Sequence, residues 1–226
     1  FFFLFYCMVM MVYCLYINKK KINLKIKKKI IKKILIKFGS PIERVKNAIK
    51  ALKRKRGVIL LDDKNRENEG DIIFSAENIT TEQMALTINY GSGIVCVCIT
   101  EKFRKYLSLP LMVNNNSSKF QTPFTISVES KKNVTTGVSA NDRVKTIHTI
   151  ASNNIKNIDL NKPGHVFPLC AQPGGLLIRK GHTEAAIDLL SLANFKKIGV
   201  ICELTNKNGS MSKIIEIINF AKKYNM

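Results

Sequence analysis

The stretch Asp62-Asp63-Lys64-Asn65-Arg66-Glu67-Asn68-Glu69-Gly70-Asp71 is the one around which the rest of the chain is organised. It holds five carboxylates and one arginine within a strongly basic chain. An apolar run over 57–61 precedes it and a second run over 72–74 follows it, and both are typical of short strands. Carboxylates crowded on one loop repel each other unless something positive lies among them. The pattern therefore predicts a loop between two strands that binds a divalent cation, or, as the simpler alternative, a solvated acidic hairpin.

Length and composition indicate one globular domain with an appended N-terminal segment. The chain has 226 residues, of which 46% are hydrophobic, and its formal net charge is +21. Residues 1–38 contain ten lysines and no acidic residue, so the other 27 basic and 16 acidic residues give 39–226 a net charge of +11. A basic surface of this kind suits an anionic substrate as well as it suits nucleic acid.

The six cysteines, at positions 7, 14, 96, 98, 170 and 202, show neither zinc-ligand spacing nor a disulfide framework. Cys96 and Cys98 lie two residues apart on an expected strand, so their side chains should point to the same face. We expect the cysteines to be reduced and mostly buried, which implies a reducing compartment and a cytoplasmic protein.

Residues 1–37 form an extension for which the sequence allows three interpretations. Residues 1–17 are apolar without a charge and precede the lysines at 19–21, an order that fits a signal anchor better than a secretory signal. An apolar side chain recurs every fourth residue from Ile22 to Phe38, which is typical of a basic amphipathic helix on a membrane or on nucleic acid. In the third interpretation, the extension is translated upstream sequence and the functional start lies later.

Residues 38–226 are expected to form the globular domain, and two helix starts in it are marked by capping boxes. Ser40, Pro41 and Glu43 predict the first start, and the run from Thr80 to Gln83 predicts the second. Helices are expected over 41–56, 81–90, 103–107, 140–152, 185–193 and 214–224.

Strand patterns alternate with these helices in mixed order. Besides the two runs around the acidic stretch, strands are expected over 93–100, 124–129, 176–179 and 197–204. Proline and glycine predict turns at 163–168 and 173–175. The pattern favours an α+β (mixed α/β) fold, a single compact domain with a mixed sheet flanked by helices.

The polar residues that could carry chemistry lie near glycines and at element ends. His165 and His182 each follow a glycine, whereas His148 lies inside an expected helix and is interpreted as structural. Glu67, Glu69 and Asp71 are candidate ligands or bases, with Glu203 at a strand end. Arg66, Arg179 and Thr183 could hold a phosphate, because arginine and a hydroxyl at a helix start suit a dianion. These residue types predict a metal-assisted acid/base enzyme that acts on a small phosphorylated molecule.

The chain from about Phe38 to Met226 resembles the 3,4-dihydroxy-2-butanone 4-phosphate synthase family. The likeness runs in order through several motifs, namely 62–71, Gln83-Met84-Ala85-Leu86, 91–96, 135–140, Arg143, Pro163-Gly164-His165-Val166-Phe167-Pro168, 181–185 and 202–204.

The resemblance implies a lyase of riboflavin biosynthesis that converts D-ribulose 5-phosphate to 3,4-dihydroxy-2-butanone 4-phosphate and formate. It implies Mg²⁺ or Mn²⁺ as cofactor, with two ions per active site, and a compact α+β domain that works as a homodimer with sites near the interface. No nucleic-acid partner is expected for 38–226, and membrane contact is expected only through 1–37.

Matching motif positions imply roles for individual residues. Glu67 and His182 would be the metal ligands, and His165 and Glu203 would be needed for catalysis. The substrate would contact Arg66, Glu67, Asp71, Arg179, Lys180, Gly181, His182, Thr183 and Glu203.

The expected reaction needs an enediol, loss of a hydroxyl, a skeletal shift and release of one carbon as formate. The metal would stabilise charge on adjacent oxygens. Asp71 or Glu69 would take the first proton, and His165 or Glu203 would protonate a leaving hydroxyl or move later protons.

Two departures from the family pattern concern Lys180 and the end of the chain. Lys180 stands where family members commonly have glycine, beside the expected phosphate site. The chain stops at Met226, where members continue through a further strand and helix, so the domain is expected to be short at its C-terminus with an open sheet edge. A protein that binds membrane or nucleic acid through 1–37, and an inactive relative, are the rival interpretations.

Overall fold

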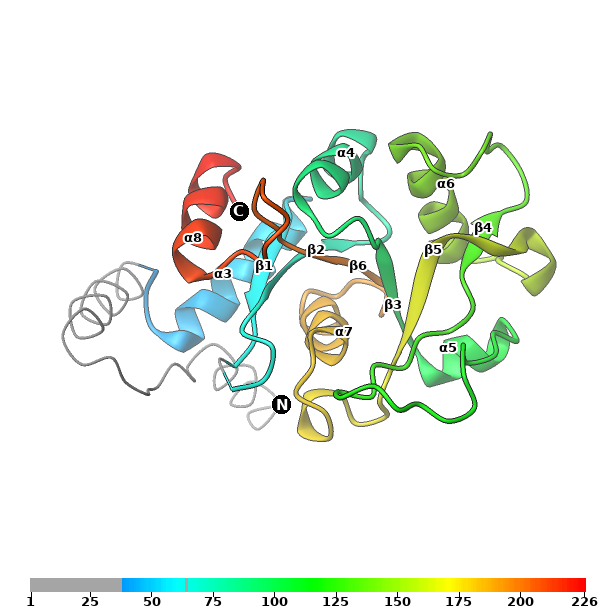
Figure 1. Cartoon of the computed structure of the whole chain (residues 1–226), viewed down its shortest axis with the longest axis horizontal. Helices are drawn as coiled ribbons and strands as arrows, with labels where there is room; N and C mark the ends of the chain where they lie inside the picture. Colours follow the sequence, from blue (N-terminus) through cyan, green and yellow to red (C-terminus); the bar gives the residue numbers. More distant parts are fainter. Residues whose placement is uncertain (1–37, 64) are drawn as a thin grey trace.

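The computed structural model describes residues 38–63 and 65–226, whose centre is one six-stranded mixed sheet (Figure 1). The strands lie in the order β1-β2-β6-β3-β5-β4. Only β3 and β5 pair in parallel, and the other pairs are antiparallel. The strands are β1 (Val58–Leu61), β2 (Gly70–Ser75), β3 (Cys96–Thr100), β4 (Val128–Ser130), β5 (Leu160–Ala171) and β6 (Gly199–Glu203).

Helices cover both faces of this sheet, so the predicted α+β class is confirmed. The α-helices are α3 (Pro41–Lys53), α4 (Thr81–Tyr90), α5 (Glu101–Tyr106), α6 (Ala140–Ala151), α7 (His182–Leu192) and α8 (Ile214–Lys223), with short 3-10 helices η1 (Asn157–Asp159) and η2 (Gly175–Leu177). In Figure 1, α4 and α6 lie on one side of the sheet and α7 lies on the other.

Alternation along the central strand β2 separates the core into two clusters. Ile72 and Phe74 pack with residues of α4, α6 and α8, whereas Ile73 packs with residues of α3 and α7. Successive side chains of a strand point to opposite faces, so the apolar run of β2 contributes side chains to both core clusters. Cys96 and Cys98 share the second cluster, as their spacing predicted, and the four cysteines of the described residues are free and buried.

Both predicted capping boxes are present. Glu43 N–H donates to Ser40 Oγ at 3.3 Å, and Ser40 N–H donates to Glu43 Oε2 at 2.6 Å, with Pro41 in the first helical turn. Thr80 and Gln83 exchange the same pair of bonds at the start of α4. These starts were predictable because a capping box involves only residues three apart.

The predicted turn over 163–168 is wrong, because these residues lie inside the long strand β5. Val128 pairs with Val166 and the next residue, Glu129, pairs with Asn161. Residues 162–165 therefore stand out between two consecutive ladder pairs as a bulge. A bulge accommodates proline and glycine within a strand, which is why their turn signal was misleading.

The predicted strand over 176–179 is also wrong, because residues 175–177 form η2. Gly174 and Gly175 have φ values of 94° and 62°, which turn the backbone out of an extended path. The Asp188 carboxylate then accepts the Leu176 N–H at 2.9 Å and holds the turn. Leu176 alone enters the core, while Ile178 is 69% exposed, so the apolar run does not mark a buried strand.

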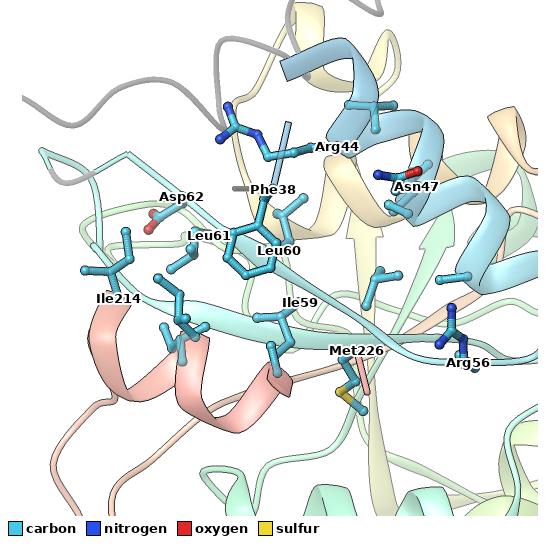
Figure 2. Close-up of a pocket in the computed structure, with 18 of the residues that line it drawn as sticks. Phe38, Arg44, Asn47, Arg56, Ile59, Leu60, Leu61, Asp62, Ile214 and Met226 are labelled. Atoms are coloured by element: carbon cyan, nitrogen blue, oxygen red, sulfur yellow. The ribbon is translucent and has the colours of Figure 1, made fainter. Parts of the chain in front are cut away.

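An apolar groove of about 320 Å³ runs between α3, β1 and α8 (Figure 2). Val45, Leu60, Ile217 and Met226 line it, and Asp62 reaches it from the acidic stretch. None of the histidines lines this groove, and Asp62 is the residue that it shares with the polar cluster described below.

The predictions made for residues 1–37 lie outside the part of the chain that the structure describes. Among residues 38–63 and 65–226, no helix combines the length and the apolar character needed to cross a bilayer.

Candidate active site

The acidic stretch is a hairpin loop between β1 and β2, as predicted, although Asp71 already belongs to β2. The fully buried Asp62 side chain shapes the loop. Its Oδ2 accepts the Glu67 N–H at 3.0 Å and an Arg66 N–H at 3.0 Å, while its Oδ1 accepts the Glu69 N–H at 2.9 Å. Sequence reasoning did not assign this role to Asp62, because nothing in the sequence shows which carboxylate of the loop turns inward.

The loop and helix α7 bring Glu67, Asp71 and His182 together. His182 is the first residue of α7 and is 5% exposed. Its Nδ1 lies 3.4 Å from Glu67 Oε2 and 3.6 Å from Asp71 Oδ1. Candidate ligand atoms of Asp62, Glu67 and His182 lie within 4.8 Å of one another. Because both oxygens of Asp62 already accept hydrogen bonds, Glu67 and His182 are the better candidates to bind a cation.

Two buried polar atoms of this cluster lack a hydrogen-bond partner among the described residues. They are Asp71 Oδ1 and His182 Nε2. An unsatisfied buried polar atom costs roughly 1–3 kcal/mol, so two of them on neighbouring side chains indicate a place where a ligand supplies the missing contacts. A cation coordinated by carboxylate and imidazole fits this donor set.

Burial and mutual charge shift the pKa values of the cluster. Burial, together with the nearby carboxylates of Glu203 and Glu67, raises the pKa of Asp71 to about 7. Burial alone would lower the pKa of His182, but the neighbouring carboxylates, Asp71 foremost, raise it to about 9. At neutral pH, His182 is therefore protonated, and Asp71 is close to the pH at which half of it is ionised.

The pKa values of Glu67 and Glu69 shift in opposite directions. Burial would raise the pKa of Glu67, but its contacts with His182 and Arg66 lower it below its ordinary value. The pKa of Glu69 is raised by burial and by the charge of Glu67. Glu67 thus stays ionised at neutral pH and is available to a cation.

Glu203 lies beside this cluster, as predicted. It ends β6 and is the cross-strand partner of Asp71. Its Oε2 accepts a hydrogen bond from Ser92 Oγ at 2.6 Å. Ser92 was noted in the sequence only as part of a motif, and its contact with Glu203, 111 residues away, could not be read from spacing.

Arg66 makes three side-chain contacts, with Asp62, Glu67 and Phe120. It pairs with Asp62 and with Glu67, and its guanidinium carbon lies 4.9 Å from the centre of the Phe120 ring. A cation over an aromatic face is attracted to the ring electrons. Phe120 belongs to a polar connection that sequence reasoning left without a role.

Arg179 is engaged with the protein itself. It pairs with the buried Glu184 at 2.7 Å and donates to Phe120 O at 3.0 Å and Thr122 Oγ1 at 3.2 Å. Lys180 beside it is exposed. Arg179 therefore ties the connection that carries Phe120 to the start of α7.

Gly181, His182 and Thr183 are buried at the N-terminus of α7. No side chain caps this helix, because its N-cap residue is Gly181. Uncapped N–H groups at a helix start attract anions, so this helix start is the candidate place for the predicted phosphate contact.

His165 lies at the same end of the sheet but outside the cluster. Its Nδ1 is 2.7 Å from Glu129 Oε1, and its side chain is 46% exposed. Cys96 of β3 lies opposite both Ile201 of β6 and Phe167 of β5. Glu203 and His165 are each two residues further along their strands, toward the same edge of the sheet. Two strand spacings place their backbones about 10 Å apart. His148, in contrast, is an exposed residue of α6 whose Nε2 lies 3.0 Å from Ile79 O, so its contact is with the neighbouring backbone and not with the cluster.

Comparisons with known proteins agree with one another. The family model of 3,4-dihydroxy-2-butanone 4-phosphate synthase matches residues 46–226. Proteins of this name from Wigglesworthia glossinidia brevipalpis and Serratia proteamaculans are 60% identical over 195 residues and 61% identical over 193 residues. These alignments cover 86% and 85% of this chain, and 92% and 89% of the two relatives.

Solved structures of the same name share the fold. One, described as a complex with two magnesium ions, has a TM-score of 0.77 at 36% identity and covers 80% of this chain and 90% of its own. Another, from Candida albicans, has a TM-score of 0.75 at 43% identity over the same shares of the two chains. The chain therefore belongs to the 3,4-dihydroxy-2-butanone 4-phosphate synthase family.

Proposed function

We propose that the cluster of Glu67, Asp71, His182 and Glu203 is the centre that converts D-ribulose 5-phosphate to 3,4-dihydroxy-2-butanone 4-phosphate and formate in riboflavin biosynthesis. The observation that carries this proposal is a buried carboxylate–imidazole cluster with two unpartnered polar atoms, in a chain of this family. The family supplies the reaction, and the geometry indicates which side chains perform it.

Glu67 and His182 would hold a divalent cation, Mg²⁺ or Mn²⁺, and the active site would contain two such ions. Support comes from the close approach of their ligand atoms, from the unpartnered His182 Nε2, and from a related structure described with two magnesium ions. When bound, the cation supplies positive charge against the negative charge that develops on substrate oxygens. Asp62 shapes the loop and is not needed as a ligand.

Asp71 takes the first proton from the substrate. A general base works best when its pKa lies near the working pH, and burial raises the pKa of Asp71 to about 7. The rival base, Glu69, is only partly buried and donates its backbone N–H to Asp62. Glu203, oriented by Ser92, and His165 remain for the later proton transfers.

The phosphate binds at the uncapped start of α7, at Gly181 and Thr183, with Lys180 and Arg66 adding positive charge. Arg179 uses one Nη1 proton and both Nη2 protons for contacts within the protein. A guanidinium has five N–H groups, so its Nε–H and its second Nη1 proton remain for the phosphate.

Product identification tests this function. Uniformly ¹³C-labelled ribulose 5-phosphate, incubated with the chain and Mg²⁺, should give formate and a four-carbon phosphate in equal amounts by NMR. Isomerised pentose phosphates without formate would show that the cluster forms an enediol but does not complete this reaction.

Metal binding should compete with the proton on His182. The pKa of His182 is raised to about 9 in the metal-free protein, and only the neutral imidazole binds a cation. Each pH unit below that pKa weakens metal affinity about tenfold, so the increase in thermal midpoint on adding Mg²⁺ should be larger at about pH 8.5 than at about pH 6.5. Equal increases at both pH values, by differential scanning fluorimetry, would remove His182 as a ligand.

The functional unit is a homodimer, and the chain acts in the reducing cytoplasm. The resemblance to the family supports the first statement, and the buried free cysteines support the second. Light scattering of the purified full chain should give twice the mass of one chain.

A further inference from the structure

We propose that Phe120 is the positioning residue of Arg66, and that its aromatic ring holds the guanidinium beside the acidic loop while leaving N–H groups for the substrate. This inference rests on the proposed contact between Arg66 and the substrate. It gives a part in substrate binding to a residue that belongs to none of the sequence motifs described above.

Phe120 is a half-buried residue in an exposed stretch. Residues 111–121 belong to the connection between α5 and β4, and all of them except Asn116 and Phe120 are exposed. Asn116 shapes the connection itself, because its Nδ2 donates to Thr122 O at 2.9 Å. Phe120 belongs to neither core cluster, and its ring centre lies 4.9 Å from the guanidinium carbon of Arg66. The burial of Phe120 therefore comes from its contact with the site and not from a core.

The backbone of Phe120 is fixed by the start of α7. Arg179 Nη2 donates to Phe120 O at 3.0 Å and to Thr122 Oγ1 at 3.2 Å. Arg179 is held in turn by Glu184, whose side chain is fully buried and whose Oε1 accepts the Gln172 N–H at 3.0 Å. The ring is thus carried by a backbone of defined position, which a side chain that orients a cation requires.

The hydrogen bonds that Arg66 forms with the described residues leave part of its donor capacity unused. Asp62 and Glu67 both contact the Nη1 atom. A guanidinium has five N–H groups, so the Nε–H and both Nη2 protons remain for a substrate. A cation over an aromatic face is attracted without a hydrogen bond. Phe120 therefore fixes the guanidinium and takes none of these N–H groups from the substrate.

The ring is also a partner whose attraction does not depend on a free carboxylate. Glu67 Oε2 contacts Arg66 and lies 3.4 Å from His182 Nδ1, and Glu67 is a proposed ligand of the cation. A carboxylate whose charge is partly neutralised by a cation attracts a neighbouring arginine less strongly. The neutral ring of Phe120 loses nothing in this way, so it keeps Arg66 in place in the loaded site.

Lys119 provides a comparison within the same stretch, because its Nζ lies 5.0 Å from the centre of the same ring. Lys119 is exposed, whereas the Arg66 side chain is 16% exposed. Cation–π contacts gain strength as the pair loses water. The contact with Arg66 is therefore the stronger of the two, and Lys119 serves as the control cation.

The competing explanation is that Phe120 is only an apolar cover over the loop. A cover depends on the volume and apolar character of the side chain, whereas a cation–π contact depends on the electrons of the ring face. Fluorine atoms on the ring withdraw these electrons with little change of shape. Leucine keeps the apolar character and removes the ring.

The test replaces Phe120, in the full chain, by phenylalanines with one, two or three ring fluorines, introduced by nonsense suppression. In formate release, KM for ribulose 5-phosphate should rise with each fluorine and reach about fivefold to thirtyfold with three, the factor expected for loss of a partly buried cation–π contact. Phe120→Leu should raise KM to the same extent. The value of kcat should stay within about twofold, because Arg66 binds the substrate and moves no proton. In the Arg66→Gln background, fluorination should leave KM unchanged.

The position of Arg66 is observed directly by NMR of the metal-free chain with ¹⁵N-labelled arginine. The ring of Phe120 shifts the Nε–H signal of Arg66, which is assigned by its loss in Arg66→Gln. Phe120→Leu should move this signal toward the value of an exposed arginine. Lys119→Ala is the matched control, because it removes the other cation near the ring, and it should leave both the signal and KM unchanged.

The outcomes separate this inference from the proposed function. A KM that rises in Phe120→Leu but does not respond to fluorine would overturn the positioning role and make Phe120 an apolar cover. A KM effect of fluorine that persists in the Arg66→Gln background would overturn it as well, because Phe120 would then act without Arg66. In both cases formate release by the unmodified chain would uphold the function. An unmodified chain that releases no formate would overturn the function, and an Arg66 signal unmoved by Phe120→Leu would overturn the ring contact independently of activity.

Discussion

Replacing Asp71 by asparagine lowers kcat for formate release by about a thousandfold, within the range that general base catalysis contributes. Asparagine has the same shape and no basic oxygen, so the substrate should still bind while its C1 proton no longer exchanges with solvent. The protein should remain folded. Because Asp71 is buried and its pKa is raised to about 7, ionising it opposes folding, and the neutral amide removes that cost at higher pH.

The measurement is exchange of the C1 proton in deuterated buffer, followed by NMR alongside formate release. Asp63→Asn is the matched control, since Asp63 lies on the same loop and its Oδ1 accepts the nearby Asn65 N–H at 2.7 Å. Retained exchange in Asp71→Asn would remove Asp71 as the base. Loss of exchange in Glu69→Gln instead would assign the step to Glu69.

Replacing Glu67 by glutamine weakens Mg²⁺ binding by about a hundredfold and lowers formate release correspondingly, with partial recovery at higher metal concentration. A neutral amide is a much poorer ligand for a hard cation than a carboxylate. The pKa of Glu67 is held low by His182 and Arg66 although burial opposes this, so its carboxylate is ionised at neutral pH and can serve as the proposed ligand. Calorimetric titration with Mg²⁺ measures the affinity.

Asp62→Asn distinguishes a ligand from a residue that shapes the loop. Asp62 accepts three hydrogen bonds in the loop, and loss of such bonds costs about 1–3 kcal/mol each time a buried partner is left unsatisfied. Asp62→Asn should therefore lower the thermal midpoint of the metal-free protein, whereas Glu67→Gln should not. A reversed pattern would make Asp62 the ligand and Glu67 the structural residue.

Those parts of the fold that depend on neighbours in sequence were predictable. The hairpin around 62–71 follows from two apolar runs that flank a polar stretch, and the helix starts at Ser40 and Thr80 follow from residues three apart. The predictions failed at 163–168 and 176–179. There, long-range contacts determine the backbone, namely the pairing of β5 with β4 and the hydrogen bond from Leu176 to Asp188.

In the candidate site, too, the features that depend on local sequence were predictable and those that depend on long-range contacts were not. Residue chemistry alone indicated a metal-assisted acid/base site on a phosphorylated substrate, and the individual roles came from the family resemblance. The contacts that orient those residues were missed, because each joins distant parts of the chain. Ser92 meets Glu203, Phe120 stacks on Arg66, and Glu129 meets His165 only after folding.

The most direct test is formate release from D-ribulose 5-phosphate by the purified full chain, measured with Mg²⁺, with EDTA, and after Mg²⁺ is restored. A cation held by Glu67 and His182 predicts formate with Mg²⁺, none with EDTA, and recovery on restoration. Formate release that is equal with Mg²⁺ and with EDTA would contradict the metal site. A folded chain that releases no formate under any of these conditions would contradict the function itself.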